Sequence, residues 1–271
     1  MIASTLRRAV RLPALILLLF GGLFTVLALF PLGGERFRRG AIRHWSRMLV
    51  AACGVRPAPA TVGAGRPLAQ LPAGRLVVAN HISWIDIFVI HSQCPCSFVA
   101  KDEIRSWPLL GTLVARTGTL FIERGKRRAV HRMIEHIERR LQAGGRVAVF
   151  PEGTTSDGRR LLPFHANLIE GALRAGVPVA PVGLRYVDGD GDSSAVIEYI
   201  GDTTFVASLW RIIGAPAVRC EVIALEEIAT GEAASRHEVA QRARSVLAAC
   251  LSLPLDDELP ENLRELRRVR A

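Results

Sequence analysis

The chain has 271 residues, of which 49% are apolar and 22% are charged, so it can bury a sizeable core and is not an intrinsically disordered protein. Its 35 Lys and Arg exceed its 25 Asp and Glu, and most of this excess lies in residues 1–47, which contain eight Arg and one Glu. Because the remainder is nearly charge-balanced and only 6% of residues are aromatic, the composition argues against a nucleic-acid-binding protein. Five Cys are too few for a disulfide-rich secreted scaffold, and the Cys94-x-Cys96 pair has no second pair at zinc spacing, so we expect reduced thiols and no metal site.

The first predicted element is a membrane anchor at residues 1–34. No charged residue occurs in the 21 positions from 12 to 32, and about 20 apolar residues span a bilayer core. The run is longer than the core of a signal peptide and no small-x-small cleavage site follows it. Two Pro and a Gly pair within it leave open a kinked segment that does not cross, so the anchor is predicted to be transmembrane or re-entrant.

The Arg residues that flank this run predict how the chain is oriented. Three Arg precede the run and five follow it closely, which places the bulk of the protein on the cytoplasmic side of the cell membrane. Residues 35–65 are predicted to form a basic amphipathic segment and a linker. Their mixture of Arg with apolar and aromatic residues suits a helix in the headgroup region, or an ordinary amphipathic helix packed on the soluble domain. The Pro, Ala and Gly of residues 56–74 favour a linker or irregular segment.

Residues 66–255 alternate short apolar runs with helical patterns, which predicts an α/β domain. We expect a mixed, largely parallel sheet of about seven strands flanked by helices. The clearest helix spans 127–143, where apolar residues recur at helical spacing and Gly144-Gly145 follows. A closing helix is expected at 235–251 and a charged tail at 256–271. The candidate strands are 75–79, 97–100, 119–122, 146–150, 179–184, 195–200 and 218–225.

The strongest local signal is the sequence NHISWID at 80–86, directly after an apolar strand. It places His81 at the C-terminal end of that strand, the edge of an open α/β sheet where ligands bind. If a helix begins near Ser83, the Asp86 carboxylate can fold back onto the imidazole and leave the other ring nitrogen free as a base. Without a Gly-x-Ser-x-Gly motif, such a pair would activate a substrate hydroxyl directly. Taken alone, this spacing is more typical of a helix N-cap and a nearby polar residue.

Three further motifs accompany other candidate strands. The sequence FPEGTTSDG at 150–158 combines turn-forming Gly with hydroxyl side chains that can contact a ligand. The sequence GTLFIER at 118–124 ends in an Arg that can bind phosphate, and Lys101 is a second cation at a strand end. Two Pro in 177–183 favour an edge or irregular strand. Each motif alone is also compatible with a turn, a surface cation or simple packing.

Taken together, the four motifs carry more information than any one of them. They occur in the order His-x4-Asp, Gly-x-x-Phe-Ile-x-Arg, Phe-Pro-Glu-Gly-Thr and Val-Pro-Val-x-Pro-Val. In this order they closely resemble the glycerolipid acyltransferase family, which includes the 1-acylglycerol-3-phosphate acyltransferases. The resemblance covers about residues 75–225, and the segment 101–118 resembles the family's spacing between its first two blocks.

The resemblance implies a role for each matching residue. His81 would be the general base and Asp86 would orient it, while Arg124 would hold the phosphate of the acceptor. Glu152 and Gly153 would belong to the acceptor site. The resulting predicted substrate-binding set is Lys101, Arg124, Glu152, Gly153, Thr154 and Thr155.

One position departs from the family pattern. Many lysophosphatidate acyltransferases have an Arg that contacts phosphate where this chain has Thr155. A charge-assisted phosphate contact contributes roughly 1.5–3 kcal/mol, so the change is large enough to alter substrate preference unless Lys101 or Arg159 replaces the missing cation. A phosphate-free acceptor such as a lyso-ornithine lipid is therefore the alternative substrate.

The resemblance thus implies a membrane-bound acyltransferase of phospholipid biosynthesis. It would move a fatty acyl group from acyl-CoA or acyl carrier protein to the hydroxyl of a lysolipid, first of all 1-acylglycerol-3-phosphate, to give phosphatidate. Because a thiolate is a good leaving group, we expect no cofactor and no metal. The expected partners are the bilayer, the lysolipid and the acyl donor. A membrane-bound esterase or thioesterase using the same His–Asp pair is the rival enzyme, and a non-catalytic membrane-binding module is disfavoured because the motif residues are intact.

Overall fold

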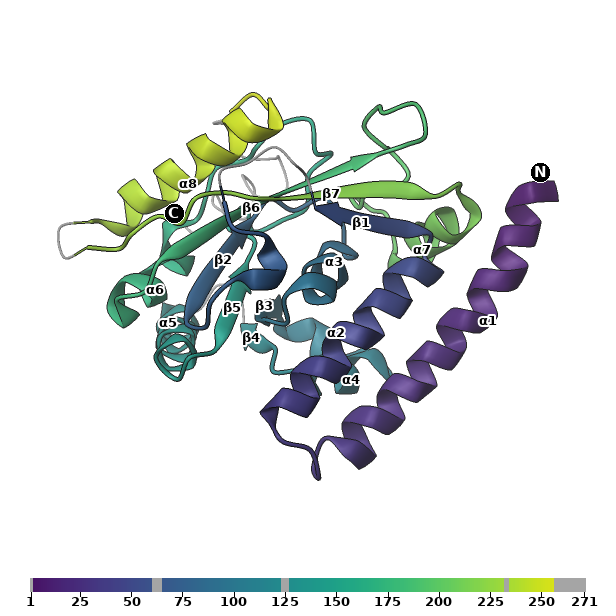
Figure 1. The fold of residues 1–271 in the computed structure, drawn as a ribbon, viewed down its shortest axis with the longest axis horizontal. Helices are drawn as coiled ribbons and strands as arrows, with labels where there is room; N and C mark the ends of the chain where they lie inside the picture. The colour runs from purple at the N-terminus through teal and green to yellow at the C-terminus, as the bar shows by residue number, and fades with distance from the viewer. Residues whose placement is uncertain (1, 60–64, 123–126, 232–233, 256–271) are drawn as a thin grey trace.

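The computed structural model describes residues 2–59, 65–122, 127–231 and 234–255, and these residues form a seven-stranded sheet of order β1-β7-β6-β2-β5-β3-β4 (Figure 1). Neighbouring strands are parallel except for the antiparallel pair β6–β7. The predicted mixed, largely parallel sheet is therefore confirmed. The strands are β1 Val55–Pro59, β2 Arg75–Ala79, β3 Ser97–Lys101, β4 Leu120–Ile122, β5 Arg146–Val149, β6 Val179–Val187 and β7 Val218–Ala224.

Helices flank this sheet, as the alternating pattern predicts. The helix expected at 127–143 and the closing helix expected at 235–251 are both present. The closing helix begins with a capping box in which Ser235 and Glu238 satisfy each other's backbone N–H groups. The helices are α1 Ile2–Phe24, α2 Glu35–Ala52, α3 Asp86–Gln93, α4 Leu110–Arg116, α5 Arg127–Gln142, α6 Glu170–Ala175, α7 Phe205–Gly214 and α8 Arg236–Leu251.

The sheet is buried on both faces, which explains why its strands are continuously apolar. Successive residues of a strand point to opposite faces. In β2, Val77 and Ala79 therefore belong to a core shared with α2, α3 and α7. Leu76 and Val78 belong to a second core shared with α5, α6 and α8 (Figure 1). The result is a three-layer α/β/α arrangement in which parallel strands end at a common edge.

Strand β1 lies inside the segment that we expected to be a linker. The Val218 N–H of β7 donates to the Gly54 carbonyl at 3.0 Å, so alternate residues of this chain segment face β7. Pro57 and Pro59 are at the intervening positions, whose backbone N–H would point away from β7, so their missing N–H groups lie on the outer side of the sheet. This is the position in which an edge strand accepts Pro, and the composition therefore conceals a strand.

Two other expectations about strands are wrong. Residues 195–200 form a turn and loop, because the apolar pattern there reflects burial of Ile197 rather than a place in the sheet. The Pro-containing strand β6 is a central strand rather than an edge strand. It accepts Pro181 because the neighbouring strand β7 ends at Ala224, so the missing N–H of Pro181 removes few hydrogen bonds from the ladder between β6 and β7. The sheet also begins at β1, before the domain boundary expected at residue 66.

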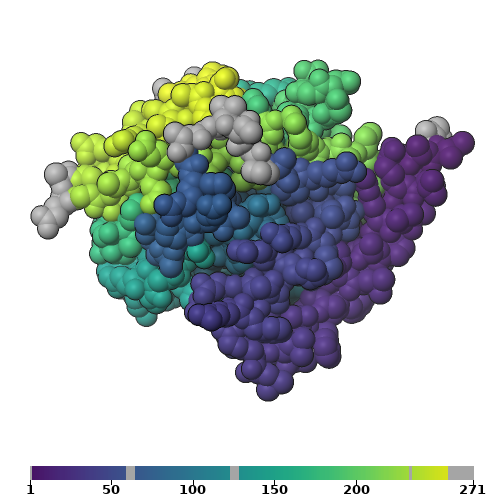
Figure 2. All heavy atoms as spheres, viewed as in Figure 1, coloured from purple at the N-terminus to yellow at the C-terminus, as the bar shows by residue number. Residues whose placement is uncertain are grey.

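Helix α1 runs beside α2 and forms a ridge along one side of the molecule (Figures 1 and 2). A π-helical turn at Thr25–Leu29 continues it, and together they are long and apolar enough to cross a membrane. The outward face of α1 carries large exposed apolar side chains, namely Leu6, Val10, Leu17, Phe20 and Phe24. The charged tail expected at 256–271 lies outside the described residues.

The inward face of α1 is held by the α/β domain along its length. Arg7 donates to the Gly214 carbonyl at 2.8 Å, and Arg11 donates to the Ala215 carbonyl at 2.8 Å. These carbonyls belong to the C-terminal end of α7, where helical carbonyls lack intrahelical partners and attract cations. Further along, Trp45 of α2 donates to the Leu18 carbonyl at 2.7 Å. Both halves of α1 therefore contact the same domain.

Candidate active site

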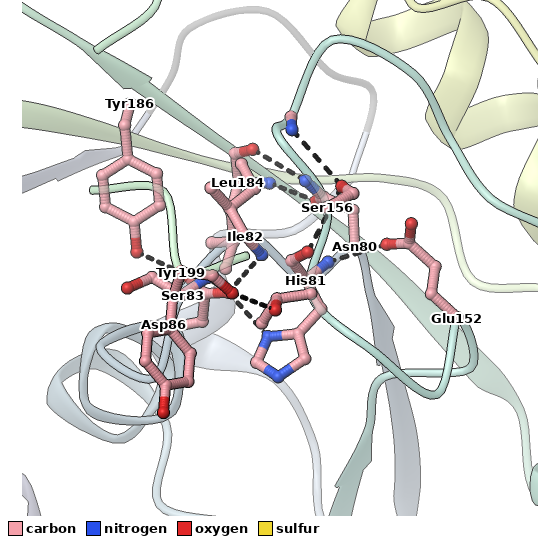
Figure 3. Close-up of polar contacts among 12 residues, drawn as sticks. Asn80, His81, Ile82, Ser83, Asp86, Glu152, Ser156, Leu184, Tyr186 and Tyr199 are labelled. Carbon is pink, nitrogen blue, oxygen red and sulfur yellow. Dashed lines mark hydrogen bonds and ion pairs between the residues drawn. The ribbon is translucent and has the colours of Figure 1, made fainter. Parts of the chain in front are cut away.

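His81 follows β2 and Asp86 is the first residue of α3, so a tight connection brings the two side chains together (Figure 3). The distance from His81 Nδ1 to Asp86 Oδ2 is 2.8 Å. The same carboxylate oxygen accepts the backbone N–H groups of Ile82 at 2.7 Å and Ser83 at 2.9 Å. These backbone donors at the start of α3 fix the position of the Asp86 carboxylate beside the imidazole. The predicted return of Asp86 onto the imidazole is confirmed.

The surroundings of His81 fix the orientation of its ring. Asp86 is fully buried, whereas the His81 side chain is 17% exposed. The His81 ring stacks on Phe150 with centroids 3.9 Å apart and an angle of 8° between the planes. With Nδ1 donating to the carboxylate, Nε2 carries the lone pair that can accept a proton. The arrangement can therefore act as a general base.

Glu152 lies after β5 and holds the backbone of the His81 loop. Its Oε1 accepts the His81 N–H at 2.8 Å and its Oε2 accepts the Leu162 N–H at 3.1 Å. Burial raises the pKa of the Glu152 carboxyl to about 8, against the effect of the two backbone donors. The Ser156 N–H also donates to the His81 carbonyl at 2.8 Å. The motif at 150–158 thus clamps both backbone groups of His81, and Glu152 is directed at that backbone.

The three residues after Glu152 form the turn of this loop. Gly153 has φ of +71°, and a Cβ at that position would lie 2.9 Å from His165 Cδ2, so both backbone and space require glycine. The Thr155 hydroxyl donates to the Tyr199 carbonyl, which ties the turn to the loop containing Ile197. Among the residues described, no acceptor contacts the backbone N–H groups of Thr154 and Thr155. These two N–H groups are donors available to a ligand.

Of the two predicted phosphate-binding cations, Lys101 is among the described residues and Arg124 is not. Lys101 is the exposed last residue of β3, and β3 and β2 both pair with β5. It therefore stands at the same sheet edge as His81 and Glu152. Arg124 lies outside the described residues, and the strand before it, β4, ends at Ile122 on that edge.

Two polar residues that contact the site were not singled out from the sequence. The Asn80 side chain exchanges two hydrogen bonds with the Leu184 backbone of β6, at 3.0 and 2.8 Å. The Tyr186 hydroxyl donates to Asp86 Oδ1 at 2.6 Å. Asn80 adjoins His81 in the first motif and could have been flagged on that ground. Tyr186 is 100 residues from Asp86 in sequence and carries no local signal.

The cysteines follow the simple expectation of buried thiols. Cys94 and Cys96 are reduced and buried, with their sulfur atoms 3.9 Å apart. Within the described parts of the chain, no three His, Cys, Asp or Glu side chains gather as metal ligands would. The absence of a metal requirement remains an expectation.

The chain is similar in sequence and in fold to known acyltransferases. The Acyltransferase family matches residues 67–185. A 1-acyl-sn-glycerol-3-phosphate acyltransferase from Neisseria meningitidis is 39% identical over 188 residues, covering 68% of this chain and 73% of that relative. A lyso-ornithine lipid O-acyltransferase from Pseudomonas aeruginosa is 34% identical and covers 79% of each chain. The crystal structure of the 1-acyl-sn-glycerophosphate acyltransferase PlsC from Thermotoga maritima shares the fold, with a TM-score of 0.66 at 20% identity over 93% of this chain and 95% of that one.

Proposed function

Because the chain belongs to the glycerolipid acyltransferase family and is an O-acyltransferase, we propose that it transfers a fatty acyl group to the hydroxyl of 1-acylglycerol-3-phosphate, giving phosphatidate. The proposed donor is acyl-CoA or acyl carrier protein. The observation that carries the proposal is the His81–Asp86 pair at the sheet edge, with Nε2 of the histidine unpaired among the described residues. This is the arrangement of a base that activates a hydroxyl without a protein nucleophile.

The reaction is a single transfer of the acyl group. His81 Nε2 takes the proton of the acceptor hydroxyl as its oxygen attacks the thioester carbonyl carbon. The C–O bond forms, the tetrahedral intermediate collapses and the C–S bond breaks. The departing thiolate receives the proton from the imidazolium, which restores neutral His81. Asp86 stabilises the imidazolium between these two steps.

The turn after Glu152 supports the charge that develops during this step. The negative oxygen of the tetrahedral intermediate needs fixed hydrogen-bond donors. The N–H groups of Thr154 and Thr155 are unpaired within the described residues, and the next N–H, of Ser156, is bonded to His81. We assign the oxyanion contacts to this turn.

The acceptor phosphate is assigned to the cations that follow β3 and β4. Lys101 ends β3, and Arg124 comes after β4 in sequence. Because β3 ends at the edge that carries His81, Lys101 lies on that edge, and the order of the motifs supports Arg124 as the second cation. Arg and Lys are the usual ligands of phosphate.

A phosphate-free lysolipid is the second candidate acceptor, and the contacts of Thr155 favour it. The Thr155 hydroxyl is occupied by the Tyr199 carbonyl, so it does not replace a phosphate-binding Arg. Arg159 pairs with Glu198 at 3.4 Å and Arg160 pairs with Asp157 at 3.7 Å, which partly neutralises the cations nearest this turn. The similarity to lyso-ornithine lipid O-acyltransferases supports the same alternative.

Helix α1 is proposed as the membrane-associated element. Its exposed apolar face suits the acyl region of a bilayer, and the Arg-rich α2 beside it suits the headgroups. A spanning helix would carry one end about 30 Å away through lipid, whereas both halves of α1 contact the domain. We therefore favour the re-entrant or interfacial alternative, with the domain on the cytoplasmic side as the flanking Arg predict.

The test is an acyl-transfer assay on the full chain in membranes. Labelled acyl-CoA or acyl carrier protein is supplied with 1-acylglycerol-3-phosphate and, separately, with lyso-ornithine lipid. We expect labelled phosphatidate from the wild-type protein and a loss of at least about 10³-fold in kcat for His81→Ala, since His81 serves as both base and acid. Transfer only to lyso-ornithine lipid would select the second acceptor. An active His81→Ala protein, or release of free fatty acid without an acceptor, would reject the proposal.

A further inference from the structure

A buried tyrosine hydroxyl contacts the candidate catalytic pair from the side opposite His81. Tyr186 lies on β6, is 2% exposed, and places its hydroxyl 2.6 Å from Asp86 Oδ1. Figure 3 shows the Tyr186 ring directed at the Asp86 carboxylate. The family match ends at residue 185, so this residue falls just outside the matched segment.

The hydrogen bonds of Asp86 are divided unequally between its two oxygens. Oδ2 receives His81 and the backbone N–H groups of Ile82 and Ser83. Oδ1 receives the Tyr186 hydroxyl alone among the described residues. A donor on one carboxylate oxygen withdraws negative charge from the other oxygen, so the Tyr186 hydroxyl can reduce the charge that faces the imidazole.

We propose that Tyr186 is a positioning residue that sets the basicity of His81 through Asp86. This inference rests on the proposed function of His81 as the base. By donating to Oδ1, the hydroxyl prevents the carboxylate from rotating and weakens its attraction for the imidazolium. His81 can then release its proton at a lower pH and act as a base over a wider range.

The surroundings of Tyr186 keep its hydroxyl in the donor form. Burial and the nearby Asp86 raise the pKa of the Tyr186 hydroxyl well above its usual value, so it stays protonated at any assay pH. The tyrosine pairs with Cys220 in the β6–β7 ladder, and the neighbouring Leu184 is fastened to Asn80. The strand thus holds the hydroxyl on a rigid support.

The test is the pH profile of kcat/KM for Tyr186→Phe in the full chain, with acyl-CoA and the acceptor that the wild-type protein uses. We expect the acid limb of the profile to move to higher pH by about 0.5–1 unit, because the carboxylate then holds the imidazolium more strongly. We also expect the plateau kcat to fall by about tenfold, with both KM values within about twofold of the wild type. A uniform loss at every pH, with the limb unmoved, would show a purely structural role and overturn the proposal.

The chain offers a matched control and an opposite perturbation, because Tyr186 and Tyr199 are its only tyrosines. Tyr199→Phe removes a hydroxyl that has no partner among the described residues and is expected to leave the acid limb in place. Replacing tyrosine by 3-fluorotyrosine in the Tyr199→Phe background changes Tyr186 alone and makes it a stronger donor. The limb should then move to lower pH, which tests the proposal even if Tyr186→Phe fails to fold. An unmoved limb in the fluorinated protein would also overturn it.

His81→Ala separates this inference from the proposed function. If His81→Ala is inactive while the limb of Tyr186→Phe does not move, the inference fails and the function stands. If His81→Ala retains activity, the proposed function fails and this inference fails with it.

Discussion

Glu152 is a buried carboxylate that connects the Glu-Gly-Thr turn to the backbone of the His81 loop. Its two oxygens accept N–H groups from residues that are otherwise far apart in sequence, His81 and Leu162. The Glu of the Glu-Gly-Thr motif, which the family resemblance assigns to the substrate site, therefore also holds the protein backbone in place. At the scale of residues, the site depends on backbone donors as much as on side chains.

The protonation of Glu152 leads to a prediction about stability. Its pKa is raised from 4.5 to about 8 in the folded chain, so the folded chain keeps a proton that the unfolded chain releases between these values. This contribution to stability is complete below pH 4.5 and declines as pH rises toward 8, by at most about 1.4 kcal/mol per pH unit. In Glu152→Gln we expect this slope to disappear. Chemical unfolding of both proteins at pH 5 and pH 8 measures it.

The same variant should be less stable at pH 5 and less active throughout. Gln has one acceptor oxygen, so one of the two buried N–H groups loses its partner, at a cost of about 1–3 kcal/mol. If wild-type and variant stabilities change in parallel between pH 5 and pH 8, Glu152 does not titrate in this range.

At the scale of elements, α8 supports the site although it lies outside the matched family segment. The buried Arg244 donates to the carbonyls of Leu161 at 2.9 Å and Leu162 at 3.0 Å. Leu162 in turn donates its N–H to Glu152. The helix therefore fixes the segment that completes the hydrogen bonding of the buried carboxylate.

Arg244→Met should accordingly destabilise the fold. It removes two charge-assisted hydrogen bonds and leaves buried carbonyls without donors, which should cost about 2–4 kcal/mol. Arg242→Met on the exposed face of α8 is the matched control and should change stability by less than about 0.5 kcal/mol. Thermal unfolding of the three proteins decides the matter, and equal melting temperatures for both variants would contradict this role of α8.

At the scale of the whole molecule, α1 lies along one side of the α/β domain (Figure 2). Its outward face carries exposed apolar side chains. Arg7 and Arg11 fasten its first half to the C-terminal end of α7. Gly22 allows its second half to approach α2 and α4, because an added Cβ would lie 2.7 Å from Trp45 Nε1 and 2.9 Å from Leu113 Cδ1. These contacts hold both halves of α1 against the α/β domain.

This packing predicts where the start of α1 lies in the cell. A tag fused before α1 and a tag at the opposite end of the chain should be cleaved by protease from the same face of sealed membrane vesicles. Since both halves of α1 contact the domain, we expect both tags on one face, and the flanking Arg predict that this face is cytoplasmic. Cleavage of the two tags from opposite faces would establish a spanning helix. The vesicles are inverted so that their outer face is cytoplasmic, and a reporter protein enclosed in their lumen controls for leakage.

The sequence by itself determined the elements whose signals are local. Apolar periodicity located α5, and continuous apolar runs located β2 to β7 of a sheet buried on both faces. Motif order identified the family, and the position of His81 after a strand, with Asp86 near a helix start, anticipated the contact between these two side chains. Each of these rests on residues close together in the chain, where spacing alone constrains geometry.

The tertiary structure decided what depends on distant partners. Pro57 and Pro59 look like a linker until β7 supplies the neighbour that makes β1 an edge strand. The donor to Asp86 Oδ1 comes from Tyr186, and the clamp on His81 comes from Glu152 after another strand. No local pattern encodes these contacts, because the order in which strands assemble, rather than the spacing of residues along the chain, brings their ends together.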